Sequence, residues 1–150
     1  MANVLLTGAA GAIGMDLAFS LNLAKINVFA TEADEDNFFL VSKSCKYYNK
    51  VFRAPRAGNK DYIHRINEII DQEKIDIVIP NPDFEVGFIS KVRDQIKSPL
   101  FLPSDETVQI LLSKSLTAQK IGSLAPRTFD VDSESDLRKA ISSEKVVWLR

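Results

Sequence analysis

Cysteine and histidine are almost missing from this sequence of 150 residues, which contains one of each, Cys45 and His64. A single cysteine cannot form a disulfide within the chain, and one thiol with one imidazole is too few for a zinc site. Hydrolases with a Ser-His-Asp or Cys-His arrangement would have to rely on His64 alone. The sequence therefore points away from disulfide-bonded, zinc-dependent and triad-dependent proteins.

Excess charge and long apolar runs are also lacking. The 19 Lys and Arg residues nearly balance the 20 Asp and Glu residues, which gives a net charge of −1. Such a chain lacks the basic surface that is typical of nucleic-acid or anionic-membrane binding. No uncharged apolar run reaches the ~18 residues of a membrane span, and the first residues lack the basic region of a signal peptide. We therefore expect a cytoplasmic protein without nucleic-acid or membrane partners, and a homo-oligomer stays open.

Short apolar runs that alternate with amphipathic stretches dominate the first two thirds of the chain. The apolar runs are typical of strands buried in a parallel sheet, and they lie at 4–7, 26–31, 51–54, 75–79 and 100–102. The stretches between them predict helices at 13–23, a short helix or turn near 38–41, a helix after Asp61, and one over 83–96. This alternation predicts an α/β fold, a Rossmann-like doubly wound parallel sheet of about five strands in the order 3-2-1-4-5.

The last third of the chain has a different pattern. A helix is expected from Ser104 to a C-cap at Gly122, and another from Ser133 to Ile141. Strands are expected over 126–131 and 146–149, the latter being strongly apolar.

The chain ends directly after the last expected strand, so we interpret it as the front portion of a longer polypeptide. The predicted division is a Rossmann-like domain at 1–112, followed at 113–150 by a linker helix and an incomplete α+β segment.

A glycine-rich turn joins the first expected strand to the first expected helix. Gly8, Gly11 and Gly14 have the spacing G-x-x-G-x-x-G, and such glycines let a phosphate or another anion approach the start of a helix. Glu32 follows the second expected strand, near where dinucleotide-binding folds keep a ribose-binding acid. The glycines would equally suit a turn that lets a helix and a strand pack closely, and the acids at 32–36 would suit a solvated turn.

A short-chain dehydrogenase would need further features that this chain lacks. None of the three tyrosines, Tyr47, Tyr48 and Tyr62, is followed four positions later by the lysine that this family uses. The segment 79–83 after the fourth expected strand is bulky and rigid, whereas a cofactor lying across it would need small residues. An NAD(P)-binding dehydrogenase or epimerase therefore stays an alternative, as does a non-catalytic Rossmann-like binding module.

Two acids, Asp83 and Glu85, follow the fourth expected strand at the edge of the sheet where ligands bind. Either could contact a substrate amine or a nearby basic group. For Asp83, capping the next helix is the simpler interpretation. Arg53, Arg56 and Lys60 form a basic loop after the third expected strand, which could attract an anion or be no more than a charged loop.

Five segments occur in an order that points to a known superfamily. They are Ile77-Val-Ile-Pro-Asn-Pro-Asp-Phe-Glu85, Leu102-Pro-Ser-Asp-Glu106, Ser113-Lys114 with Thr117, Ala125-Pro126-Arg127-Thr128 and Val146-Val147-Trp148-Leu149-Arg150. Together they resemble the pre-ATP-grasp domain and the start of the nucleotide-binding lid of ATP-grasp ligases related to carbamoyl-phosphate synthase and biotin carboxylase. The sequence departs from that pattern at Ser113, where the family often has Asp, and at 123–125.

The resemblance implies an ATP-dependent ligase that forms an acyl phosphate from a carboxylate or amino-acid substrate. It implies that Lys114 and Arg150 contact the phosphates of ATP, and that Gly8, Gly11, Gly14, Asp83 and Glu85 face the substrate. The glycine-rich lid loop and the Mg²⁺ ligands of the family would follow Arg150, so no metal ligand and no catalytic residue is expected within these residues. We therefore expect ATP and Mg²⁺ to act in the full-length enzyme and the 150-residue chain to be inactive by itself.

Overall fold

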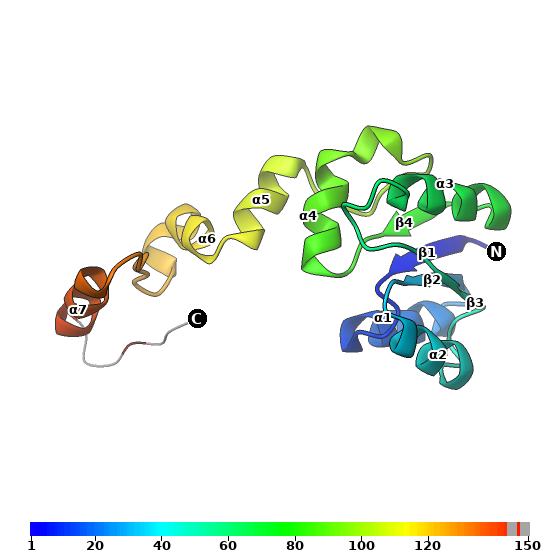
Figure 1. The fold of residues 1–150 in the computed structure, drawn as a ribbon, viewed down its shortest axis with the longest axis horizontal. Coiled ribbons are helices and arrows are strands. Elements are labelled where there is room, and N and C mark those ends of the chain that lie inside the picture. Colours follow the sequence, from blue (N-terminus) through cyan, green and yellow to red (C-terminus); the bar gives the residue numbers. More distant parts are fainter. Residues whose placement is uncertain (144–146, 148–150) are drawn as a thin grey trace. The chain divides into compact units, whose positions relative to one another are not determined.

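The computed structural model describes residues 1–143 and 147 (Figure 1). The chain divides into two compact units, a sheet unit at Met1–Val108 and a C-terminal unit at Gln109–Arg150.

Four parallel strands form the centre of the sheet unit. They are β1 (Asn3–Thr7), β2 (Asn27–Glu32), β3 (Lys50–Arg53) and β4 (Ile77–Ile79). Their order is β3-β2-β1-β4, and Leu5 of β1 lies opposite Phe29 of β2 and Val78 of β4. The predicted Rossmann-like α/β fold with a parallel sheet is confirmed.

The fifth strand that the sequence predicts at 100–102 is reduced to one bridge. Leu100 pairs with Val78 in parallel, with hydrogen bonds from Val78 N to Pro99 O (2.9 Å) and from Phe101 N to Val78 O (2.8 Å). Pro99 and Pro103 have no backbone N–H and cannot donate to a ladder, which limits the pairing to this point. The segment therefore lies beside β4, where the fifth strand was expected, but the sheet has four strands and not five.

Helices cover both faces of this sheet. Figure 1 shows α1 (Ala12–Leu23) and α2 (Glu35–Ser44) on one face, and α3 (Tyr62–Glu73) and α4 (Asp83–Lys91) on the other. The helix α2 is longer than the short helix or turn expected near 38–41. The side chain of Asp34 caps its start by accepting a hydrogen bond from Asn37 N at 3.0 Å. The predicted helix over 83–96 ends at Lys91 and is followed by a 3₁₀ turn, Arg93–Gln95.

The core consists of two apolar layers that follow from the alternation of side chains along each strand. Leu5 and Val78 belong to the layer under α3 and α4, which also contains Ile66, Ile69 and Ile89. Val4 and Leu6 point the other way and pack in a layer with Ala18 of α1 and Val41 of α2. Because β1 lies between the two layers and is covered on both sides, its residues Val4, Leu5 and Leu6 form an uninterrupted apolar run.

The helix expected from Ser104 to Gly122 is broken at Ser113. It forms α5 (Asp105–Leu112), which contains the boundary between the units, and α6 (Lys114–Ile121). Ser113 has an extended backbone, and its Oγ caps α6 by accepting a hydrogen bond from Leu116 N at 3.2 Å. Gly122, with φ +64°, ends α6 as predicted.

After α6 the described residues of the C-terminal unit form a 3₁₀ turn, Gly122–Leu124, and one further α-helix, α7 (Glu134–Ser143). Ser133 precedes it and accepts a hydrogen bond from Asp136 N at 3.2 Å, as the predicted capping pattern requires. Residues 126–131 form no strand, which corrects the prediction: an extended segment becomes a strand only where a second segment pairs with it. The strand predicted at 146–149 lies outside the described residues except at Val147. None of the helices in the described residues is both long and apolar enough to cross a membrane.

Candidate functional site

The carboxyl ends of β1 and β4 meet at one edge of the sheet. From β1 the chain crosses over to β2 on one side, whereas β4 lies on the other side, so a crevice opens between the two strand ends. The turn after β4 is fastened to the end of β1, because Asn81 N donates a hydrogen bond to Oγ1 of the buried Thr7 at 3.1 Å. This contact fixes the segment that carries Asp83 and Glu85 against the glycine loop.

Two of the three loop glycines are needed for packing within the protein. Gly8 has φ +67°, and a Cβ there would lie 2.3 Å from Cγ of Pro82. A Cβ on Gly14 would lie 2.7 Å from the carbonyl oxygen of Gly8, so Gly14 lets α1 approach the loop. At Gly11 a Cβ would meet no atom closer than 3.8 Å. Gly11 is therefore the glycine that leaves room for a ligand.

Glu32 is not part of a solvated turn, because its side chain is buried and bound by backbone amides. One carboxylate oxygen accepts a hydrogen bond from Ala10 N at 3.1 Å, and the other accepts from Ala33 N at 3.0 Å and Asp34 N at 3.1 Å. These charge-assisted bonds tie the glycine loop to the end of β2. The Glu32 carboxylate thus accepts the hydrogen bond of Ala10 N, which is then not available to an anionic ligand.

A cavity of about 540 Å³ lies over this edge. Its walls come from the glycine loop with the start of α1, from the end of β2 with α2, and from the turn between β4 and α4. The structure therefore brings together five of the residues that the sequence singled out, namely Gly8, Gly11, Glu32, Asp83 and Glu85. Gly14 lies behind the loop and does not line the cavity.

Glu85 is the most unusual group in this cavity. The residue is 4% exposed, and its Oε2 has no hydrogen-bond partner among the residues that the structure describes. Burial raises the pKa of its carboxyl to about 7; the Thr7 hydroxyl lowers it, the charge of Glu32 raises it, and the Tyr62 hydroxyl lowers it. A buried carboxyl without a cation beside it is costly, and such groups are frequent in ligand sites.

The hydroxyl of Tyr62 on α3 shares this environment. It is buried and also lacks a hydrogen bond of standard geometry within the described part of the chain. Burial raises its pKa far above the ordinary value, and the charge of Glu85 raises it further. Sequence reasoning assigned Tyr62 only to the apolar stripe of its helix. The sequence did contain a signal of a polar contact at Tyr62, since it places a tyrosine hydroxyl on a helix face otherwise made of isoleucines. A buried tyrosine oxygen normally requires a hydrogen-bond partner.

Asp83 does not cap α4, which corrects the simpler interpretation of this residue. Pro82 holds the N-cap position, and Asp83 is the first helical residue, with an exposed side chain. Its negative charge in the first turn stabilises the helix through the helix dipole. The carboxylate lines the same cavity as Glu85, which makes this wall of the site acidic.

The two expected ATP ligands belong to the C-terminal unit. Lys114 is exposed and is the first residue of α6, whereas Arg150 lies outside the described residues. Their assignment to ATP phosphates stays a prediction. Across residues 1–143 and 147 no three His, Cys, Asp or Glu side chains are grouped as a metal ion would require.

Comparison with known proteins finds similarity among solved structures. No protein-family model and no curated protein matches the chain. A single-chain, multi-domain long-chain acyl-CoA carboxylase aligns over 95% of this chain and 15% of its own, with a TM-score of 0.56 and 16% identity. The phosphoribosylaminoimidazole carboxylase ATPase subunit from Aquifex aeolicus aligns over 80% of this chain and 31% of its own, with a TM-score of 0.51 and 18% identity.

A reductase shares the fold over a shorter part of the chain. An actinorhodin polyketide ketoreductase, solved with NADPH, aligns over 53% of this chain and 32% of its own, with a TM-score of 0.46 and 18% identity. This chain therefore spans about a third or less of each of these three structures. At such identities the similarity concerns the fold alone.

Proposed function

We propose that this chain is the N-terminal, substrate-binding part of an ATP-dependent ligase of the ATP-grasp kind, related to carbamoyl-phosphate synthase and biotin carboxylase. The observation that carries the proposal is the cavity at the carboxyl ends of β1 and β4, with the buried carboxyl of Glu85 in its wall, whose Oε2 has no hydrogen-bond partner among the described residues. The fold similarity to two carboxylase structures, which extends beyond the sheet unit, is consistent with it.

The cavity suits a ligand that has both an amine and a carboxylate, such as an amino acid. A ligand ammonium beside Glu85 and Asp83 would supply the cation that the buried carboxyl lacks. A ligand carboxylate would find the first N–H groups of α1, because Gly11 is the N-cap and provides no side-chain cap. The open space at Gly11 lets such a group approach the backbone closely.

The glycine loop suits a dinucleotide less well. In dinucleotide-binding folds the glycines make room for a pyrophosphate next to the loop. Here Pro82 lies against Gly8, and the Glu32 carboxylate already binds Ala10 N. Both contacts use space or donors that a pyrophosphate would need. They favour a small substrate over the NAD(P) alternative, which the absence of a Tyr-x-x-x-Lys pair also disfavours.

Bound ATP with Mg²⁺ would supply the phosphoryl group for an acyl phosphate in the full-length enzyme. In this chain we assign the binding of its phosphates to Lys114 and Arg150, a flexible ammonium and a planar guanidinium. The exposed position of Lys114 at the start of α6 is compatible with that role. The isolated chain is expected to bind substrate and to lack ligase activity.

The test is a titration of the ¹⁵N-labelled 150-residue chain, observed by NMR, with each free L-amino acid, with bicarbonate and with NADH. We expect an amino acid to shift the amides of 11–13 and 83–86, and Glu85→Gln to weaken that binding at least tenfold. Glu106→Gln removes an exposed carboxyl on α5 and serves as the matched control. NADH binding in the micromolar range through the glycine-loop amides would refute the ligase proposal in favour of a dehydrogenase.

A further inference from the structure

A second cavity, of about 410 Å³, lies at the carboxyl end of β3. It is bounded by the end of β3 with the loop after it and by the first turns of α3. Arg53, His64 and Arg65 line it, together with Asp61 and Glu68. Ala33 lines both this cavity and the one that contains Glu85, so the two cavities adjoin along the same edge of the sheet.

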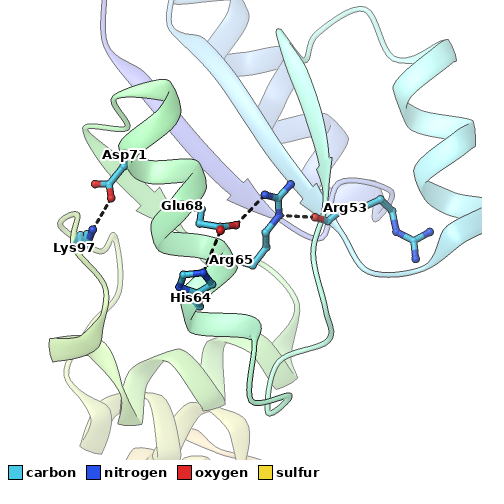
Figure 2. Close-up of polar contacts among 6 residues, drawn as sticks. All are labelled: Arg53, His64, Arg65, Glu68, Asp71 and Lys97. Carbon is cyan, nitrogen blue, oxygen red and sulfur yellow. Dashed lines mark hydrogen bonds and ion pairs between the residues drawn. The ribbon is translucent and has the colours of Figure 1, made fainter.

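The guanidinium of Arg53 is held in place but has no hydrogen-bonding or ionic partner within residues 1–143 and 147. It lies 5.8 Å from the ring centroid of Phe38 on α2, a cation–π contact that orients the planar group. Figure 2 shows it pointing away from Arg65, with no contact drawn to its nitrogens. Five N–H donors are therefore left to bind an acceptor that the described residues do not supply.

Of the two acids that line this cavity, Glu68 is committed to α3, and Asp61 forms no ion pair with Arg53 within the described residues. Glu68 forms ion pairs with Arg65 Nη1 and His64 Nε2, both at 3.1 Å (Figure 2). Arg65 Nε donates to the carbonyl oxygen of Arg53 at 3.1 Å, so Arg65 holds the backbone beneath the free guanidinium. Glu68 thus balances the α3 cations and leaves the charge of Arg53 uncompensated.

Charge is distributed unevenly along this edge. Residues 53–65 contain the basic residues Arg53, Arg56, Lys60 and Arg65 but only one acid, Asp61, in a chain whose net charge is −1. The adjoining first cavity is acidic, with Asp83 and Glu85 in its wall. The formal charges that line the second cavity itself cancel, Arg53 and Arg65 against Asp61 and Glu68, so the feature that would attract an anion is the guanidinium of Arg53, to which no described residue is hydrogen-bonded.

We propose that the second cavity binds an anionic group, a phosphate or a carboxylate, and that Arg53 is its principal ligand. The planar fork of the guanidinium matches two oxygens of such a group. The inference does not require the ATP-grasp proposal. The anion is either one end of a ligand whose amine lies at Glu85 or a separate anion, and both have the same chemistry at Arg53.

The experiment titrates inorganic phosphate into the ¹⁵N-labelled 150-residue chain at constant ionic strength. We expect shifts at the amides of Ala33, 53–57 and 64–65, and Arg53→Gln should raise the dissociation constant at least tenfold. Arg56→Gln removes the same charge from the same loop but does not line the cavity, and it should change the constant less than threefold. Equal losses in the two variants, or no wild-type shifts at these amides, would overturn the proposal.

A series of ω-aminoalkyl phosphates with two to six carbons then distinguishes the two sources of the anion. A member that binds tighter than inorganic phosphate, and loses this advantage in Glu85→Gln, supports a ligand that bridges both cavities. Affinities equal to that of phosphate throughout the series, all lost in Arg53→Gln, support a separate anion. Because the Arg53 side chain is exposed, we expect Arg53→Gln to keep the wild-type circular dichroism and melting temperature.

Discussion

Replacing Glu85 with glutamine keeps the size of the side chain and removes a carboxyl that titrates inside the protein. Burial raises the pKa of this carboxyl from 4.5 to about 7 in the folded state. The folded protein therefore holds a proton on Glu85 in a pH range where the unfolded chain has released it. The stability that the folded protein gains by holding this proton is fully present below about pH 4.5, and it is lost as the pH rises through about 7.

The size of the effect follows from the same two pKa values. Their difference corresponds to roughly 3 kcal/mol of unfolding free energy, an upper bound because a folded protein can admit water to a charged group. Other groups near Glu85 are unchanged in the variant: Glu32 keeps its three backbone hydrogen bonds, and Tyr62 does not titrate in this range. We expect Glu85→Gln to match the wild type within about 1 kcal/mol at pH 5 and to exceed it by roughly 2–3 kcal/mol at pH 8.

Urea denaturation at half-unit steps from pH 4.5 to 8.5 measures this difference. Glu106→Gln, at an exposed position, should follow the wild-type curve and shows what a surface carboxyl contributes. If the curves of Glu85→Gln and the wild type run parallel over the whole range, Glu85 has an ordinary pKa. The site could then not be described as a buried carboxyl that lacks a cation.

Three further changes test other parts of the structure. Gly8→Ala should destabilise the protein by roughly 3 kcal/mol, because it combines a positive φ with a clash against Pro82. Gly58→Ala, where φ is +86° and no atom lies within 4 Å of an added Cβ, should cost about 1 kcal/mol. Equal losses of stability in thermal denaturation of the two variants would contradict the packing of Gly8. Tyr62→Phe removes a buried hydroxyl without a partner, so the unfolding free energy at pH 6 should stay equal or rise by up to about 1 kcal/mol, and a clear loss would show that the hydroxyl is bonded. Lys114→Ala in the full-length enzyme should raise the KM for ATP severalfold with little change in that for the substrate, and an unchanged KM would remove the proposed role of this lysine.

Local patterns were enough to predict most of the sheet unit. The run 4–7 was predicted to be a strand buried on both sides, and β1 is buried in this way, with Leu5 and Leu6 fully buried. Where a strand predicted from the pattern did not form, the cause was the lack of sufficient pairing with a neighbouring segment. Residues 126–131 have a strand-like sequence, but no strand within residues 1–143 and 147 pairs with them, and the segment near Leu100 makes a single bridge between two prolines. The capping serine at 113 interrupts a pattern that otherwise continues from α5 into α6.

The sequence alone determined which residues meet at the edge of the sheet, because parallel strands joined by helices must all end on the same side. Gly11, Asp83 and Glu85 were found in this way. Only the tertiary structure decided their state, since burial and hydrogen bonding depend on residues far apart in the chain. Burial raises the pKa of Glu85, with smaller effects from Thr7, Glu32 and Tyr62, and Pro82 takes the space above Gly8. Charge and solvation depend on three-dimensional surroundings, which no local pattern of residues encodes.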